Sequence, residues 1–123
     1  MLVDEHLGDD GALLRTELRL RGEQLELVDS TAIRRLPEGA LSAVFARLGG
    51  ELSESVTVPE DAESLVFADG SRLRRLRFLD RFDVIAKDYL VLSVPGAPDR
   101  VGLAVTLTAA LRHLASALER NTP

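Results

Sequence analysis

The sequence contains no cysteine and no tryptophan, and its aromatic residues are four phenylalanines and one tyrosine. Without cysteine, the chain has no disulfide, no thiolate nucleophile and no zinc site built on sulfur. Because nothing argues for an oxidising compartment, we expect a reducing, cytoplasmic environment. The scarcity of aromatic rings disfavours single-stranded nucleic acid as a ligand, since such sites stack bases on aromatic side chains.

Long apolar runs are also missing. The longest uncharged stretches, Tyr89–Pro98 and Val101–Leu111, fall short of the roughly 18 residues that a membrane span needs. The first ten residues carry four acids and no lysine or arginine, unlike a signal or transit peptide. The net charge of −5 repels phosphate backbones and anionic lipids. We therefore expect neither a membrane nor a nucleic acid as partner.

The composition of the chain is that of one globular domain. It has 123 residues, of which 46% are hydrophobic and 28% charged, enough to fold around a single core. We expect an acidic N-terminal tail over residues 1–10, a single α/β domain over residues 11–120, and a short C-terminal tail over residues 121–123.

The first half of this domain shows a hairpin and then a helix. Leu13–Leu20 and Gln24–Asp29 have apolar residues at period two and are joined by a short turn containing glycine, which predicts a β-hairpin. After Pro37, apolar residues recur at spacings of three and four up to Leu48, which predicts an amphipathic helix. Gly49 and Gly50 follow and are suited to end it.

The second half predicts more strands and a closing helix. Asp69-Gly70 indicates a two-residue hairpin turn, and broken alternation indicates a bulge near Arg74-Arg75. Asp99 is suited to cap the last helix, whose leucine stripe must cover a sheet. The predicted segments are the strands Ser55–Val58, Ser64–Ala68, Arg72–Leu79, Phe82–Ala86 and Tyr89–Val94 and the helix Asp99–Arg120. We expect an α+β fold: an antiparallel sheet of about five strands, with a middle helix and a C-terminal helix packed on it.

The sequence offers little catalytic chemistry. The two histidines, His6 and His113, are too few for a metal site or a base-activated nucleophile, which need several converging groups. Asp80 and Asp83 are better suited to turns and ion pairs than to acid/base catalysis. The N-terminal acids, Asp4, Glu5, Asp9 and Asp10, lack the spacing of a calcium loop, and the glycines form no phosphate-binding pattern. We expect no catalytic residue, no cofactor, no metal and no small-molecule substrate.

The concentrated charge of the chain is a run of five arginines within ten residues, directly after the acidic stretch Glu51–Asp69. These arginines can form a solvated strand face paired with the neighbouring acids, which is the commonest arrangement of surface charge. They can also form a protein interface, where arginine is enriched, or bind phosphates. The five are Arg72, Arg74, Arg75, Arg77 and Arg81.

The order of these elements resembles the roadblock/dynein light chain family, whose members include bacterial partners of small Ras-like GTPases. The resemblance covers about Gly11 to Leu118 and omits the helix with which that family usually begins. The residues that carry it are Gly11-Ala12-Leu13-Leu14, Gly22, Leu25, Ala40-Leu41-Ser42-Ala43, Tyr89-Leu90-Val91-Leu92 and Val101-Gly102-Leu103, the last opening the final helix.

This resemblance implies a non-enzymatic, cytoplasmic adaptor that regulates a small GTPase. It also implies a five-stranded sheet and a homodimer formed through the helix Pro37–Leu48 and the strand Ser64–Ala68. The candidate interface residues are Ala43, Arg47, Leu65, Phe67, Arg72, Arg74, Arg75 and Arg77.

Two other classes of function stay open. A sheet covered by helices can enclose a pocket, as in profilin-like or sensory domains, so the alternative is a small-ligand sensor. An enzyme would need dispersed carboxylates drawn into one concave pocket with raised pKa values. The adaptor is our leading prediction from the sequence.

Overall fold

The computed structural model describes residues 1–79 and 85–120, except the side chains of residues 85, 86, 119 and 120. In this part of the chain nine strands form two antiparallel sheets, one of four strands in the order β1-β2-β3-β4 and one of five in the order β5-β9-β8-β7-β6. The elements are β1 Leu2–Leu7, β2 Leu13–Arg21, β3 Gln24–Val28, β4 Ile33–Arg35, α1 Ala40–Leu48, β5 Gly50–Glu51, β6 Ser64–Val66, β7 Arg72–Leu79, β8 Ile85–Ser93, β9 Arg100–Leu103 and α2 Ala104–Arg120.

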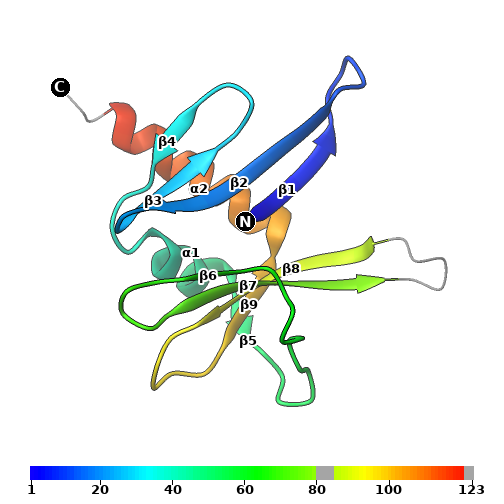
Figure 1. Cartoon of the computed structure of the whole chain (residues 1–123), viewed down its shortest axis with the longest axis vertical. Coiled ribbons are helices and arrows are strands. Elements are labelled where there is room, and N and C mark those ends of the chain that lie inside the picture. The colour runs from blue at the N-terminus through cyan, green and yellow to red at the C-terminus, as the bar shows by residue number, and fades with distance from the viewer. Residues whose placement is uncertain (80–84, 121–123) are drawn as a thin grey trace.

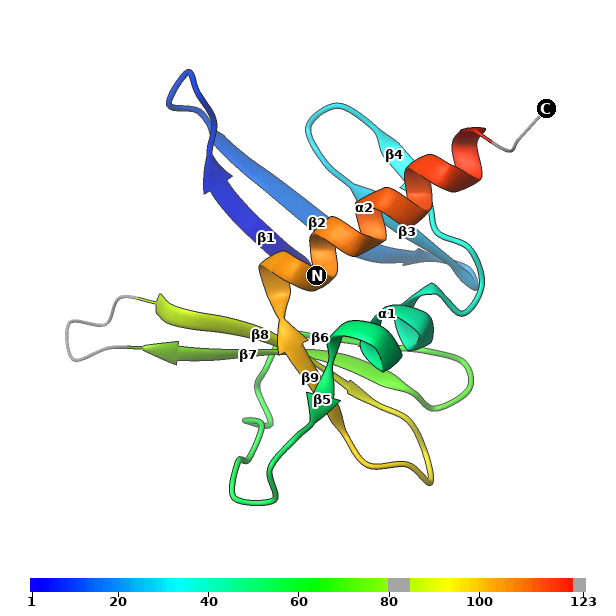
Figure 2. The ribbon, with the colours of Figure 1, turned by 180° about the vertical axis from the view of Figure 1, so that it is seen from behind.

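The predicted α+β class and its two helices are confirmed, but the strands divide between two sheets instead of forming one. Figure 1 shows the four-stranded sheet above the five-stranded sheet, with both helices behind them, and Figure 2 shows the helices from their own side. The main core lies between the sheets and the helices, and it contains buried residues from β1, β2, β3, both helices, β7 and β8.

The predicted N-terminal tail is wrong, because residues 2–7 form the edge strand β1. Val3 is fully buried in the main core, and the register of β1 against β2 shifts between Leu2 and Asp4. The acids that suggested a solvated tail instead find partners: Glu5 accepts a hydrogen bond from Arg15 at 3.0 Å. An edge strand with charged side chains is a common way to limit unwanted strand pairing.

The predicted hairpin Leu13–Leu20 with Gln24–Asp29 is confirmed as β2 and β3, with Leu18 opposite Leu27 in their register. Both of these leucines are buried. The turn depends on Gly22, whose φ of 63° lies in the left-handed region that glycine adopts without steric cost. β4 then adds a strand that the sequence did not reveal.

The predicted helix after Pro37 is confirmed as α1, although it begins at Ala40. The end of the helix at Gly49 has a different cause from the one expected. Gly49 has an extended backbone with φ of −97°, but a Cβ atom there would lie 2.8 Å from the backbone oxygen of Phe45. Glycine is therefore required by close approach of the backbone rather than by a left-handed conformation.

The strand β7 contains no bulge at Arg74-Arg75, where its register against β8 is regular; the shift lies between Phe78 and Leu79. The alternation is broken because this strand is covered on both faces. Leu73 is buried in the main core, whereas Leu76 is buried in a second cluster on the opposite face with Val58 and Val91.

The segment between β5 and β6 covers that second face, and the strand predicted at Ser55–Val58 is wrong. These residues form turns and irregular backbone, with Val58 buried against the sheet. The β6–β7 hairpin is confirmed, but its turn is one residue longer than predicted, since the N–H of Phe67 donates to the carbonyl of Ser71. Gly70 has a φ of 89° in this turn.

The last helix starts at Ala104, not at Asp99, because residues 100–103 pair with β8 as the strand β9. Leu107, Leu111 and Ala115 are buried, so α2 covers the sheets as predicted. The predicted strand Tyr89–Val94 is confirmed up to Ser93 as part of β8, while most of the predicted strand Phe82–Ala86 lies outside the described residues. No helix in the described residues is long and apolar enough to cross a membrane.

Candidate functional site

The predicted interface arginines share one strand but point to opposite faces of the five-stranded sheet. Arg75 is buried, and its Nε donates to Asp88 Oδ1 at 3.0 Å while Nη2 also bonds Asp88 Oδ2. Arg77 lies 3.7 Å from the same carboxylate. Asp88 therefore joins a buried arginine and an exposed arginine in one ion-pair cluster.

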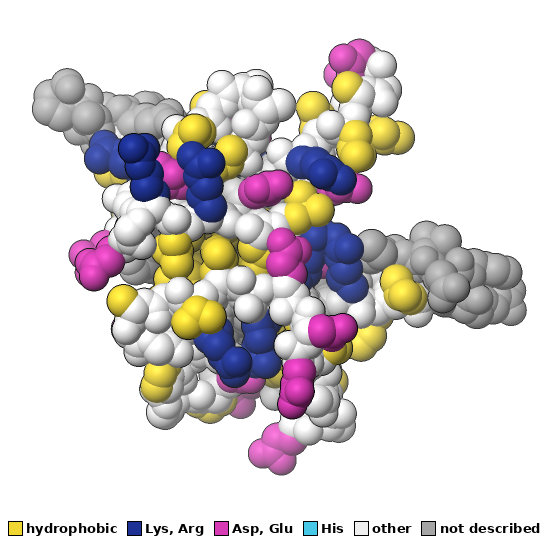
Figure 3. All heavy atoms as spheres, viewed as in Figure 1, with side chains coloured by type: hydrophobic (Ala, Val, Ile, Leu, Met, Phe, Trp, Pro, Cys, Tyr) yellow, Lys and Arg dark blue, Asp and Glu magenta, His cyan; other side chains and the backbone are white. Residues whose placement is uncertain are grey.

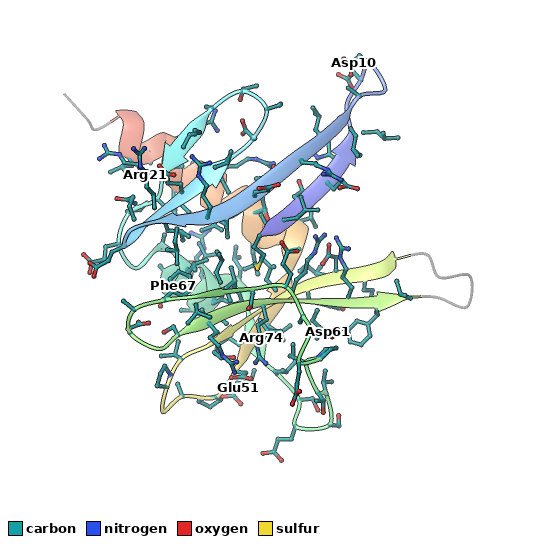
Figure 4. The ribbon with its side chains drawn as sticks, in the orientation of Figure 1. Asp10, Arg21, Glu51, Asp61, Phe67 and Arg74 are labelled. Atoms are coloured by element: carbon teal, nitrogen blue, oxygen red, sulfur yellow. The ribbon has the colours of Figure 1, made fainter. Side chains whose placement is uncertain are left out.

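Arg74 lies on the other face of the sheet from Phe67 (Figure 4). Its Nη2 donates to Ser93 Oγ at 2.8 Å and to Asp99 Oδ2 at 3.3 Å. The acids that pair with β7 thus come from β8 and from the segment before β9, not from Glu51–Asp69 as predicted. The pairing of β7 with β8, and of β8 with β9, decides these contacts. It brings the carboxylates of Asp88 and Asp99 to the arginines of β7, although the acids of Glu51–Asp69 are closer in the sequence.

The other predicted interface residues do not join the arginines on one surface. Ala43 and Arg47 lie on the exposed side of α1 and Arg72 is exposed on β7, whereas Leu65 and Phe67 are partly buried against the main core. Phe67 lines a cavity together with residues of β3, α1 and β8.

The histidines and most acids singled out in the sequence do not converge on one another. His6 is exposed, with Nδ1 3.4 Å from Asp4 Oδ2, and His113 is exposed on α2. Among the described residues no group of three or more potential metal ligands gathers. Asp80, Arg81 and Asp83 lie outside the described residues.

The structure instead forms a cavity of about 540 Å³ between the two sheets, at the start of α1. Its volume lies within the roughly 300–1,000 Å³ of small-molecule sites. We call it the inter-sheet cavity. Figure 3 shows apolar side chains in the hollow between the upper and lower sheets. The apolar lining residues are Leu25, Leu36, Pro37, Ala40, Leu41, Phe67 and Leu92.

Three carboxylates, Glu23, Glu38 and Asp69, border this cavity, and none of the described residues that line it is basic. All three are exposed, and no ion pair is found for them among the described residues. The hydrogen bond from the Ser71 backbone N–H holds the pKa of Asp69 below its usual value. Asp69 is therefore ionised at neutral pH.

The polar part of the wall is fixed by its own hydrogen bonds. Gln24 Nε2 donates to the carbonyls of Leu25 and Leu36 at 3.0 and 2.8 Å, which ties β3 to the segment before α1. The start of α1 carries no side-chain cap.

A second cleft, of about 430 Å³, lies between β1 and the β7–β8 hairpin. The described residues that line it include three basic and three acidic side chains: Arg75, Arg77, Lys87, Asp4, Glu5 and Asp88. The three acids already have ion-pair partners, Asp88 with Arg75 and Arg77, Glu5 with Arg15 and Asp4 with Arg112, so this cleft shows no surplus of negative charge for a cation. The inter-sheet cavity is the stronger candidate site.

Sequence reasoning missed the three carboxylates because they are far apart in the chain. Each is next to a glycine with positive φ: Gly22, Gly39 and Gly70 have φ values of 63°, 77° and 89°. Three acid-and-glycine turns thus meet at one cavity. The acid-glycine pairs were visible in the sequence, but their convergence depends on the packing of the two sheets.

Comparisons with protein-family models, curated proteins and solved structures find no match to this chain. The interpretation of the site therefore rests on its geometry and charge.

Proposed function

We propose that this chain is a non-enzymatic binding protein whose inter-sheet cavity receives an organic cation, an ammonium or guanidinium group on an apolar body. The observation that carries the proposal is the charge of the cavity: among the described residues, three carboxylates and no basic side chain lie around its apolar lining residues. This is the ligand-sensor alternative of the sequence analysis, now with a ligand class.

The lining of the inter-sheet cavity is complementary to an organic cation in charge and in polarity. A cation that leaves water needs charged or hydrogen-bonding partners, and carboxylates without ion pairs provide them. The apolar wall favours a ligand with a hydrocarbon body, at about 25 cal/mol per Å² of surface removed from water. Phe67, the aromatic residue of the lining, adds a ring whose face attracts cations.

The same lining argues against catalysis in the cavity. The described part of the lining contains no histidine, lysine or arginine, so it supplies no such base to activate its two serines, Ser42 and Ser71. A carboxyl group that works as a general acid at neutral pH needs a raised pKa, whereas the pKa of Asp69 is lowered by its hydrogen bonds to Ser71.

The cationic group can belong to a free amine or to a lysine or arginine side chain of a protein. The second source would make the chain an adaptor, the leading prediction from the sequence. A small GTPase as that protein stays a prediction of the family resemblance. The cytoplasm is the proposed compartment, because the chain contains no cysteine.

A thermal-shift series tests the proposal and separates the two sources. The probes are phenethylamine, agmatine and short peptides with one lysine or arginine, each beside a neutral analogue in which the cation is acylated or replaced by an amide. A bound probe at a hundredfold its dissociation constant stabilises the fold by about 2.7 kcal/mol, a rise in melting temperature on the order of 10 °C.

The matched variants remove two negative charges each. Glu23→Gln with Asp69→Asn neutralises the cavity, and Glu54→Gln with Asp61→Asn neutralises two exposed acids that do not line it. We expect the first pair to abolish stabilisation by cations and the second to preserve it. Equal stabilisation by the neutral analogues, or no stabilisation by any probe, contradicts the proposal.

A further inference from the structure

The four-stranded sheet has one face covered by α2 and one face open to solvent. Leu18 and Leu27 are buried on the covered face, whereas alternate residues of β2, Arg15, Glu17 and Arg19, are exposed on the other. We call this open side the outer face. It faces the viewer in Figures 1 and 3, and α2 lies in front of the sheet only when the molecule is turned, in Figure 2.

The register of the strands places three apolar residues, Leu2, Val28 and Ile33, in one row across the outer face, with Glu17 between the first two. Leu2 is opposite Glu17, Glu17 is opposite Val28, and Val28 is opposite Ile33. Ile33 is 56% exposed. At the β1–β2 end, Leu7 and Leu13 are opposite each other and are 71% and 51% exposed. Exposed apolar side chains grouped on one sheet face mark interaction surfaces.

The next row consists of Arg19, Glu26 and Arg35 in direct register. Glu26 is only 4% exposed although it lies on the open face, and it accepts a hydrogen bond from Arg19 Nε at 3.0 Å. Over the whole outer face, four arginines, Arg15, Arg19, Arg21 and Arg35, stand against three glutamates, Glu5, Glu17 and Glu26. The face is close to neutral in a chain of net charge −5.

We propose that the outer face binds a second copy of this chain, so that the two four-stranded sheets pack face to face. The distribution of charge on the outer face favours a second copy of the chain as its partner. Two copies with a net charge of −5 each repel one another over most of their surfaces, but here arginines and glutamates are interspersed. A near-neutral mixed face is complementary to itself, and this complementarity sets the orientation of the pair.

A two-fold axis parallel to the strands, between β2 and β3, gives the simplest pairing. It sets Leu2 opposite Ile33 of the second copy and Arg19 opposite Glu26 of the second copy. Packed sheets align within about 30° of each other and lie about 10 Å apart. The residues that this pairing sets opposite each other, Leu2, Arg19, Glu26 and Ile33, do not line the inter-sheet cavity. The proposal is therefore independent of the proposed function.

The size of the face predicts a weak dimer. The four strands are 6, 9, 5 and 3 residues long. At a rise of about 3.4 Å per residue and a spacing of about 4.8 Å between strands, they give a face on the order of 400 Å². Two such faces bury on the order of 800 Å² in total, below the roughly 1,200 Å² at which stable specific interfaces begin. We expect dissociation in the micromolar range, with dimers at high micromolar concentration.

Light scattering after size-exclusion chromatography tests the dimer. The chain should move from its 13.4 kDa monomer mass towards twice that value as concentration rises. Ile33→Arg should hold it at the monomer mass, and the matched control Val66→Arg, at a 62% exposed position of the other sheet, should dimerise like the wild type. Circular dichroism checks that both variants fold.

Cross-linking tests the orientation, because a chain without cysteine accepts new ones cleanly. With Leu2→Cys and Ile33→Cys together, a short bis-maleimide should give a covalent dimer. Within one copy these positions lie on opposite edge strands, about 14 Å apart. The control of Leu2→Cys with Val66→Cys should not cross-link between copies. A wild type that stays monomeric at high micromolar concentration overturns the proposal, as does equal cross-linking of the control.

Discussion

The ion pair of Arg75 and Asp88 gives the sharpest stability prediction. The side chain of Arg75 is 6% exposed and that of Asp88 is 25% exposed, and Arg75 donates from Nε and Nη2 to both carboxylate oxygens. Asp88→Ala leaves a buried guanidinium without its counter-ion. Breaking a buried pair in this way costs about 3–5 kcal/mol, and partial exposure of Asp88 points to the lower end.

Asp88→Ala also removes the ion-pair partner of Arg77, but this adds little to the loss of stability. Arg77 is 36% exposed and 3.7 Å from Asp88 Oδ2, so its contribution is within the roughly 0–1 kcal/mol of surface pairs. Urea denaturation of Asp88→Ala should therefore show a loss of about 3 kcal/mol, a large part of the 5–15 kcal/mol that stabilises a typical domain.

A double-mutant cycle separates the ion pair from general damage. Replacing both partners, Arg75→Met with Asp88→Leu, should recover much of the stability lost in Asp88→Ala, because no unpaired charge is then buried. Arg72→Ala, at an exposed arginine of the same strand, should change stability by less than about 0.5 kcal/mol. A loss below about 1 kcal/mol in Asp88→Ala, or additive effects in the cycle, would refute an internal role for Arg75.

Three further outcomes follow from the structure. Leu111→Ala, at a fully buried position, should cost about 2–5 kcal/mol in urea denaturation. Gly49→Ala should cost about 1–3 kcal/mol in the same assay, because its Cβ meets the Phe45 carbonyl oxygen at 2.8 Å; an unchanged midpoint would count against this. The pKa of Asp69 lies below its ordinary value of 3.8, so its carboxylate stabilises the fold above that pH and the contribution is lost as pH falls through the folded value. Asp69→Asn should lose less stability than the wild type between pH 5 and pH 2, and identical pH profiles would contradict the assignment.

The elements that the sequence predicted correctly are those set by local pattern. The hairpin of β2 and β3 shows alternation with a glycine turn, and α1 has helical spacing that ends at Gly49. The start of α2 was misplaced because Leu103 continues the helical stripe of Leu107 and Leu111 and also fits the end of a strand. Pairing of Val101 with Val91 in β8 decides between them, and that contact is not local.

The division into two sheets was missed for a similar reason. The acids of β1 suggested a solvated tail, and the single buried residue that anchors the strand, Val3, gives no periodic signal. On β7, Leu73 and Leu76 were assigned to one face with a bulge between them, whereas they belong to two cores on opposite faces. One buried apolar residue on each face of a strand does not show in the sequence that both faces of the sheet are covered.

The candidate site was the least predictable part of the molecule. Arginines of β7 drew attention because they are adjacent in sequence, but alternation sends Arg74 and Arg75 to opposite faces. The carboxylates of Glu23, Glu38 and Asp69 belong to three separate turns and meet only when the sheets pack. The candidate cavity is therefore bordered by the acid-and-glycine turns and not by the segment with the highest density of charge.

The most direct test of the inter-sheet cavity as a cation site is an NMR titration of the isotope-labelled chain with phenethylamine, repeated with its neutral N-acetyl analogue. Binding of the amine should shift the backbone amide resonances of Leu25, Phe67 and Ser71, which line the cavity, and the acetylated compound should leave them in place. Equal shifts with both compounds, or shifts confined to residues away from the cavity, would contradict the account.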